Sequence, residues 1–453
     1  MNRFSENMDM LHGALAKKLL RFTLPIALSS MLQQLFNAAD TCIAGMLGDA
    51  GALAAVGTNT EPVALIVTVS SGLSTGVNLL IANRIGRRET DGLSDAVRCA
   101  LRLALIIGAA AALAGQFAAG ALLRLIQTPE GVFPSAVRYL RIYLAGYPFL
   151  LLYDFGAAVL RARGDSRRPF FALVISGIVN VLLNLLLAVV LRLGVAGVAI
   201  ATAASNALSA GIILRRLCRE GLLCRTCGRS CKGAAAEILR TGVPSAIQGA
   251  VFCFANIFVQ AAVNRFGAAA IAGSAIAMNF EYFAYYAITA FGQTAATFTG
   301  QNHAAGAYGR CRKILWLCMG FSMLCSLAMT APAAVFRTSF AGMFSGDPAV
   351  IESACTRMGC VLLFEPLCNL YEIPAGVLKG SGHAALPAAC TMTGTCVFRI
   401  VWICTVFRAH PSPELLYRAF PLSWIVTAVL IALGFAALRP LYGNCKPARR
   451  TQM

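Results

Sequence analysis

An acidic side chain, Asp40, stands inside an otherwise apolar stretch, LLRFTLPIALSSMLQQLFNAADTCIAGML, at residues 19–47. A carboxylate at the centre of a bilayer costs about 2.5–3.5 kcal/mol on insertion scales, so it normally faces a cavity or a partner. Burial favours its neutral form, whereas a passing cation favours its charged form. Asp40 therefore has the chemistry of an ion-coupling site. The alternative is an acid near the helix end that snorkels to water.

Two amides, Asn180 and Asn184, stand four residues apart in a second apolar run. Residues at i and i+4 lie on one face of a helix. This spacing is consistent with a polar site inside the membrane. The alternative is that both amides bond to neighbouring helices.

The second half of the chain supplies two further intramembrane acids. Glu281 lies in AMNFEYFAYYAI, among apolar and aromatic residues with no adjacent cation. Glu372 follows Glu365 by seven residues, so these two acids share a helix face. We interpret Glu281 and Glu372 as cation sites of the second half, and for Glu372 a structural pairing with Lys379 or Arg399 stays open.

Aromatic residues surround Glu281, and they fit a cleft that binds flat organic cations through cation–π contacts. For each one, packing between helices or facing lipid is the alternative. The residues are Phe280, Tyr282, Phe283, Tyr285 and Tyr286.

The composition indicates that these apolar segments lie in a membrane. The chain has 453 residues, of which 58% are hydrophobic and 13% are charged, whereas soluble domains carry about 25% charged residues. Apolar runs of the length that spans a bilayer recur throughout, without the alternation of a β-barrel. We therefore predict an all-α polytopic membrane protein. Most of the 17 cysteines lie in these runs, where cysteine behaves as a small hydrophobe.

Twelve spans are predicted, and they are listed here by residue number: 17–43, 52–82, 97–123, 134–160, 168–191, 195–217, 238–264, 268–300, 312–337, 349–378, 385–408 and 415–438. The net charge of +19 comes from short Lys and Arg clusters between every second pair of runs. This pattern argues against nucleic-acid binding, which needs a folded basic surface. By the positive-inside rule it places both termini in the cytoplasm, with the protein in the plasma membrane.

The second half repeats the first at a spacing of about 218 residues. PLCNLYEIPAGVLKGSGHAALP (366–387) repeats PFLLLYDFGAAVLRARGDSRRP (148–169), and Pro244 matches Pro25. Six spans in each copy give both the same orientation, so we predict two pseudo-symmetric six-helix lobes around a central cleft, a transporter plan. The expected parts are an N-terminal lobe (1–217), a cytoplasmic linker (218–236) and a C-terminal lobe (237–453).

The linker contains four cysteines, and its Cys-x2-Cys element resembles half a zinc site. Their spacing is irregular, so we expect no metal. They are Cys218, Cys224, Cys227 and Cys231.

Four ordered segments resemble the multidrug and toxic compound extrusion (MATE) family of the MOP superfamily. They are LPIALSSMLQQLFNAADTCIAGMLGDAGALAAVG (24–57), VLRARGDSRRP (159–169), NVLLNLLLAVVLRLGVAGVAIATAAS (180–205) and AFGQTAATFTGQNHAAGAYGRCRK (290–313). The resemblance implies a secondary antiporter that exports organic cations, drugs or toxins. Entry of H+ or Na+ would drive export through alternating access.

The resemblance also implies site residues. Asp40 falls at the family's first-helix aspartate, and Thr202 would line the same site. In the fifth helix the family pattern is Asn, three residues and Asp, but here Asn184 replaces that acid, and an amide cannot titrate. Asn carbonyls can still ligate Na+ or hydrogen-bond a protonated Asp40. We assign substrate contacts to Gln34, Asn37, Phe280, Tyr282 and Tyr285.

Three other functions compete with the exporter. A lipid-linked precursor flippase of the same superfamily would favour a cleft rich in arginine, whereas only Arg399 stands mid-helix. A membrane-embedded prenyltransferase needs paired Asp-rich motifs within spans, and an ATP-driven pump needs a GxxxxGK[ST] loop; the sequence has neither. We expect no enzyme activity, no cofactor besides the coupling ion, and a monomer in the lipid bilayer.

Overall fold

The computed structural model describes residues 8–46, 50–89, 92–126, 128–223, 232–439 and 441, and within these ranges all regular structure is helical. The first lobe comprises α1 (Leu15–Met46), α2 (Ala50–Thr58), α3 (Thr60–Gly86), α4 (Leu93–Leu125), α5 (Phe133–Ala145), α6 (Tyr147–Ala162), α7 (Arg167–Asn184), the π-helix η1 (Leu185–Val190) and α8 (Val195–Arg219).

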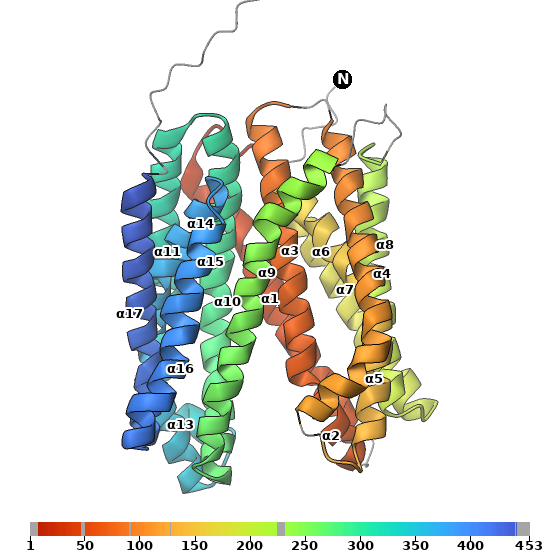
Figure 1. Cartoon of the computed structure of the whole chain (residues 1–453), viewed down its shortest axis with the longest axis vertical. Coiled ribbons are helices and arrows are strands. Elements are labelled where there is room, and N and C mark those ends of the chain that lie inside the picture. Colours follow the sequence, from red (N-terminus) through yellow and green to blue (C-terminus); the bar gives the residue numbers. More distant parts are fainter. Residues whose placement is uncertain are drawn as a thin grey trace, which may run out of the picture.

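The second lobe begins with α9 (Lys232–Asn264), which lies beside the first lobe in Figure 1. It continues with α10 (Ala268–Ala304), α11 (Tyr308–Val335), α12 (Arg337–Gly342), α13 (Pro348–Cys360), the 3-10 helix η2 (Leu362–Cys368), α14 (Asn369–Gly380), α15 (Ala385–Thr391), the π-helix η3 (Met392–Val397), α16 (Phe398–Trp402), the π-helix η4 (Ile403–Phe407) and α17 (Pro413–Leu438).

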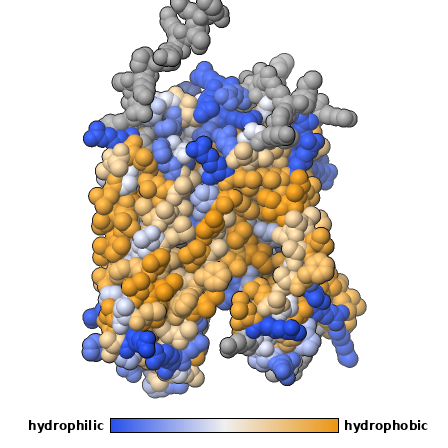
Figure 2. All heavy atoms as spheres, in the orientation of Figure 1, coloured by the Kyte–Doolittle hydropathy of each residue, from blue (hydrophilic) through white to orange (hydrophobic). Residues whose placement is uncertain are grey.

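Nine helical segments of the described chain are long and apolar enough to cross a membrane, and the bent pair α5 and α6 makes a tenth. The two remaining long helices, α1 and α10, are less apolar because they carry many amide, hydroxyl and carboxylate side chains. Figure 2 shows an apolar band across the face in view, with hydrophilic residues at both ends. The fold is therefore the predicted all-α membrane bundle of two six-helix lobes.

Several predicted spans are broken helices. The second one, at 52–82, is divided into α2 and α3 at Asn59, and the fourth is bent by 43° between α5 and α6. At that bend a Cβ on Gly146 would lie 2.7 Å from the Ala203 Cβ, so only glycine lets α8 approach. The predicted tenth span contains the 3-10 turn η2 around Pro366, which cannot donate a backbone hydrogen bond.

Residues 224–231 of the predicted linker lie outside the described ranges. The structure ends α8 at Arg219 and starts α9 at Lys232. Cys224, Cys227 and Cys231 fall outside the described residues, and Cys218 is a free, exposed thiol.

Helix α1 contacts both lobes. Near its N-terminal end, Phe22 packs edge-to-face on Phe298 of α10 at 5.4 Å, and the Thr23 hydroxyl lies 2.8 Å from that of Thr294. Its C-terminal half packs along α7 of its own lobe. Pro25 lies between these two halves, where a proline removes one helix hydrogen bond.

The lobes meet tightly at the end of the molecule that carries the N-terminus, here called the N-terminal face. There α3 packs along α9, and a Cβ on Gly76 would lie 2.2 Å from the Ile238 carbonyl oxygen. At the opposite end the lobes separate, and Figure 2 shows the cleft that opens between them. The molecule is thus closed at its N-terminal face and open at the other.

Candidate functional site

A buried polar cluster joins three helices of the first lobe at Asp40. Asn184 of α7 donates a hydrogen bond of 2.5 Å to Asp40 Oδ1, and the Thr202 hydroxyl of α8 lies 3.3 Å from Asp40 Oδ2. Asn180 accepts from the Asn184 amide at 3.2 Å, and its own Nδ2 donates to Thr202 at 3.4 Å. The structure thus brings together the four residues of the first lobe that the sequence analysis assigned to ion coupling.

The local helix geometry sets this arrangement. Asn180 and Asn184 lie one turn apart on α7, and the π-helix η1 begins directly after Asn184. Single π-turns inside α-helices frequently mark functional sites. Thr202 also lies 3.1 Å from the Val198 carbonyl of its own helix. Its single hydroxyl proton can serve only one of these acceptors at a time.

The cluster has more acceptors than donors. Both protons of the Asn184 amide are used, by Asp40 and by Asn180, while Asn184 Oδ1 is buried without a hydrogen-bond partner among the described residues. Asp40 is only 8% exposed. A buried unsatisfied acceptor costs about 1–3 kcal/mol. A proton on the carboxylate or a bound cation would correct the imbalance.

In the second lobe, Glu281 is paired with a buried arginine. Glu281 forms a two-pronged ion pair with Arg357 of α13, with Nε to Oε1 at 2.8 Å and Nη2 to Oε2 at 2.7 Å. Arg357 also donates to Ser274 at 2.6 Å. Both charged residues are buried. Glu281 has no cation near it in sequence, but the fold supplies one from 76 residues away, so its charge is already compensated.

Glu372 lies on α14, packed against Gly292 of α10, and Lys379 lies seven residues further along the same helix. Arg399, the other candidate partner, instead donates to Ser423 at 3.0 Å and stacks over the Phe420 ring at 4.1 Å. Glu281 and Glu372 thus do not form one shared site with Asp40.

The predicted substrate contacts divide into two groups. Gln34 accepts a hydrogen bond of 3.1 Å from Tyr286 across the lobes, and Tyr286 stacks with Tyr282 at 6.1 Å. Tyr285 instead stacks on Phe252 of α9 at 6.5 Å.

The other two residues lie elsewhere. Asn37 is exposed. Phe280 packs within an apolar cluster of the second lobe, with its ring centroid 5.6 Å from that of Phe340 and 6.0 Å from that of Phe344. Because these rings belong to the lobe's own packing, Phe280 is removed from the group around Gln34.

Sequence reasoning missed three polar or aromatic participants. Arg357 and Phe252 carry no sequence signal of their own, since only the tertiary fold brings them to Glu281 and Tyr285. For Asp154 the sequence did contain a signal, because the internal repeat aligns it with Glu372. In the structure it accepts a hydrogen bond of 2.5 Å from Ser70 of α3.

The chain matches a protein-family model, several characterised or named relatives and several solved structures. The MatE family model matches residues 25–186 and 244–404, so its two copies start at the prolines that the repeat pairs. The chain is 26% identical over 375 residues to the probable multidrug resistance protein YpnP of Bacillus subtilis, covering 83% of this chain and 84% of the relative. It is 27% identical over 402 residues to a probable multidrug resistance protein NorM of Thermotoga maritima, covering 83% and 82%.

A third relative, the FAD transporter of Shewanella oneidensis, is 27% identical over 394 residues, covering 82% of this chain and 85% of the relative. Among solved structures, a MATE in complex with MaL6 superimposes with a TM-score of 0.89 at 22% identity, covering 96% of this chain and 99% of that one. A MOP superfamily transporter from Pyrococcus furiosus gives 0.87, also at 22% identity, covering 96% and 98%.

Proposed function

Because the chain belongs to the MatE family of membrane transporters, we propose that it is an antiporter that exports organic cations in exchange for H+ or Na+. The observation that carries this proposal is the acceptor-rich cluster around Asp40. We further propose that it works as a monomer in the plasma membrane. The basic clusters support cytoplasmic termini.

Asp40 is the coupling carboxylate in this proposal. Its neighbours are neutral amides and a hydroxyl, whereas the carboxylate of Glu281 is held by Arg357. A proton or Na+ that reaches Asp40 from the open cleft neutralises it and satisfies the free oxygen of Asn184. When the cleft opens to the cytoplasm, water can solvate the carboxylate again, and the ion is released there.

The concentration gradient of the coupling ion supplies the energy for export. When one ion enters for each monovalent cation that leaves, no net charge crosses the membrane, so the membrane potential contributes nothing to the exchange. Since about 1.4 kcal/mol corresponds to a tenfold concentration ratio, a tenfold ion gradient sustains a substrate gradient of about tenfold.

The substrate proposal rests on aromatic rings near the lobe interface. Tyr282 and Tyr286 stack beside Gln34, and Tyr285 stacks on Phe252. Such rings attract flat cations through their faces. The flippase alternative is not favoured, because Arg357 is paired with Glu281 inside the second lobe. Arg399 donates to Ser423 and lies over the Phe420 and Phe252 rings, which leaves its Nη1 as the one guanidinium nitrogen of this pair of arginines that is buried without a hydrogen-bond partner among the described residues.

The test is transport into proteoliposomes under an imposed pH gradient or an imposed Na+ gradient, each applied separately, with a fluorescent organic cation. Asp40→Asn should retain substrate binding and lose gradient-driven transport. Asp347→Asn is the matched control, because Asp347 is an exposed N-cap of α13 and asparagine caps helices equally well. Transport by Asp40→Asn at the wild-type rate would refute the assignment.

A further inference from the structure

Residues 8–13, which precede α1, are seated between the lobes at the N-terminal face. This segment is called the strap below. Met10 is only 1% exposed and packs with Phe298 of α10 and with Cys311 and Ile314 of α11. A methionine buried at this depth outside a membrane span indicates a specific seat for the strap.

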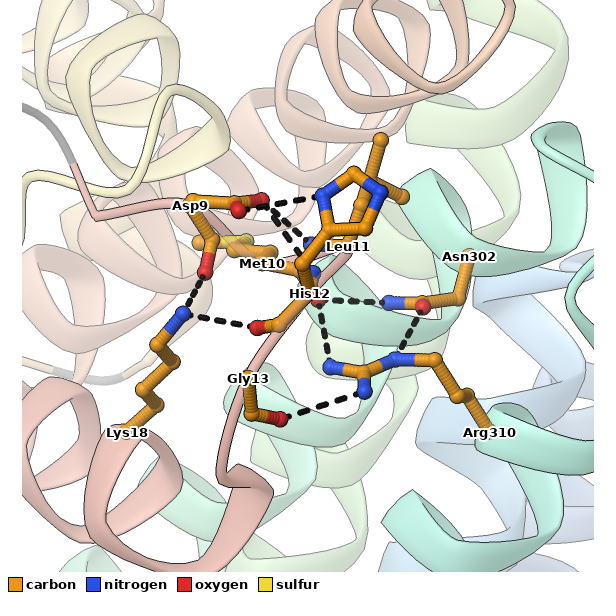
Figure 3. A network of polar contacts seen from close by, with 8 residues as sticks. All are labelled: Asp9, Met10, Leu11, His12, Gly13, Lys18, Asn302 and Arg310. Atoms are coloured by element: carbon orange, nitrogen blue, oxygen red, sulfur yellow. Dashed lines mark hydrogen bonds and ion pairs between the residues drawn. The ribbon is translucent and has the colours of Figure 1, made fainter.

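Two side chains of the second lobe bind the strap backbone (Figure 3). Asn302 donates to the Met10 carbonyl at 3.1 Å. Arg310 donates to the same carbonyl at 3.3 Å and to the Gly13 carbonyl at 3.2 Å. Arg310 Nε also donates to Asn302 Oδ1 at 3.1 Å, which holds both groups in place. Hydrogen bonds from a charged donor are the stronger kind.

The strap also contacts the first lobe. A Cβ on Gly164, in the turn between α6 and α7, would lie 2.4 Å from the Met8 carbonyl oxygen, so the backbones are in direct contact there. Further along, Leu11 and His12 line a cavity of about 400 Å³ together with residues of both lobes. The lining from the first lobe is Gly86, Arg87 and Arg88, and that from the second lobe is Ala304, Ala305 and Ala307.

The strap has its own internal structure, which fixes its shape. Asp9 Oδ1 accepts the backbone N–H groups of Leu11 at 2.8 Å and His12 at 3.3 Å, an Asx-type turn. Lys18, from the first turn of α1, donates to the carbonyls of Asp9 at 2.6 Å and His12 at 2.7 Å. Gly13 has a φ of +74°, a conformation that favours glycine. The segment therefore binds as a preformed unit.

The strap is seated above direct contacts between the lobes. Gln301 Nε2 donates to the Ala162 carbonyl at 2.6 Å, and the Thr297 hydroxyl donates to Asn78 Oδ1 at 2.9 Å. Asn302 follows Gln301 on α10, so the strap seat and the lobe contact share one helical turn. Separating the lobes at this face therefore moves the second-lobe seat away from Gly164.

We propose that residues 8–13 act as a strap that keeps the cytoplasmic face closed and must leave part of its seat before the cleft opens inward. This inference rests on the alternating access of the proposed function and adds a gate element to it. The strap favours the outward-open state, because opening the cytoplasmic face either exposes Met10 or breaks the contact between Met8 and Gly164. Coupling at Asp40 has to overcome this cost in each cycle.

The test measures the distance between the lobes. Spin labels carried by non-natural amino acids at Arg219 and Gly309, both exposed at this face, report opening by pulsed electron resonance without replacing the native cysteines. Arg310→Ala and Met10→Asp should each raise the ratio of cytoplasm-open to cytoplasm-closed molecules by about tenfold, from the loss of charged hydrogen bonds or of buried apolar area.

Two control variants make the outcome specific. Lys313→Ala removes a charge from an exposed position on the same helix, and Met10→Leu keeps the apolar contact. Both should leave the distance distribution at wild type. Arg310→Ala and Met10→Asp distributions that match these controls would overturn the proposal. A variant that fails to fold is replaced by removal of residues 2–13, with the same expectation.

This readout needs no transported compound. If the proposed organic-cation substrate or the proposed antiport is wrong, the test of the strap is therefore still valid. Wild-type coupling together with unchanged distances would reject the strap alone.

Discussion

The Asn184 side chain donates a hydrogen bond of 2.5 Å to the Asp40 carboxylate, across 144 residues of sequence. The family pattern that the sequence resembles has an acid at this position of the fifth helix. The structure places the substituted amide directly against the remaining acid. The cluster around Asp40 therefore holds one carboxylate where two would share a proton or a cation, and Asn184 offers its free carbonyl oxygen in place of the second.

Asn184→Asp should change how the cluster binds ions. Two carboxylates at hydrogen-bond distance cannot both be charged without a proton or cation between them. We therefore expect the variant to bind Na+ or H+ more tightly than wild type, by at least about tenfold, and to release it more slowly. Ion-dependent quenching of intrinsic fluorescence in detergent measures the affinity.

Asn184→Ala is the matched control for that change, because it removes the amide without adding an acid. It should weaken ion binding relative to wild type. Equal ion affinity in Asn184→Asp, Asn184→Ala and wild type would place ion binding outside this cluster.

The membrane architecture was predictable, because it follows from the length and spacing of apolar runs. The twelve spans and the two lobes needed only hydropathy and the internal repeat. The breaks inside spans were harder to see, since Gly146 is one of 41 glycines in the chain and its role depends on the approach of Ala203. A sequence shows where a helix can bend, but its neighbours decide whether it does.

The first-lobe cluster was easier to predict from the sequence than the contacts of the second lobe. Asn180 and Asn184 belong to one helix, so their spacing already aligns them. Glu281 depends on Arg357, which comes from a separate helix and leaves no pattern beside Glu281. The same limit explains Phe280, whose partners Phe340 and Phe344 lie about 60 residues later in the sequence. Contacts between residues far apart in the sequence determine which aromatic residues lie beside Gln34, and residue type alone does not show them.

Glu281→Gln should destabilise the second lobe strongly. Removal of one partner leaves the Arg357 charge buried, and breaking a buried pair in this way costs about 3–5 kcal/mol. The double variant Glu281→Gln with Arg357→Met should recover much of that loss, because neither charge is then stranded. Thermal unfolding in detergent measures all three proteins.

Glu352→Gln serves as the control for the ion-pair prediction, since Glu352 is exposed on α13, the helix that carries Arg357. It should unfold at the wild-type temperature. If Glu281→Gln also unfolds at that temperature, the ion pair is not a structural element, and Glu281 becomes a candidate for ion coupling.

Gly76→Ala should disrupt closure at the N-terminal face. The added methyl group would lie 2.2 Å from the Ile238 carbonyl oxygen, so α3 and α9 have to separate. Gly211→Ala on α8 is the matched control, because its Cβ would meet no atom within 4 Å. We expect the spin-label distance between Arg219 and Gly309, both exposed, to increase in Gly76→Ala only. Equal distance distributions in the two variants would contradict the tight helix contact.

Tyr286→Phe should separate two contributions to substrate binding. The substitution keeps the ring that stacks on Tyr282 and removes the hydroxyl that donates to Gln34 across the lobes. If a cation binds to the ring faces, its affinity should change by less than about threefold, since such contacts depend on the π-system. Tyr286→Ala, which removes the ring, should weaken binding by about tenfold or more. Equilibrium binding of a fluorescent organic cation gives both values, and Phe280→Ala is the control ring outside this group. Equal losses in Tyr286→Ala and Phe280→Ala would show that the stacked tyrosines do not form the substrate site.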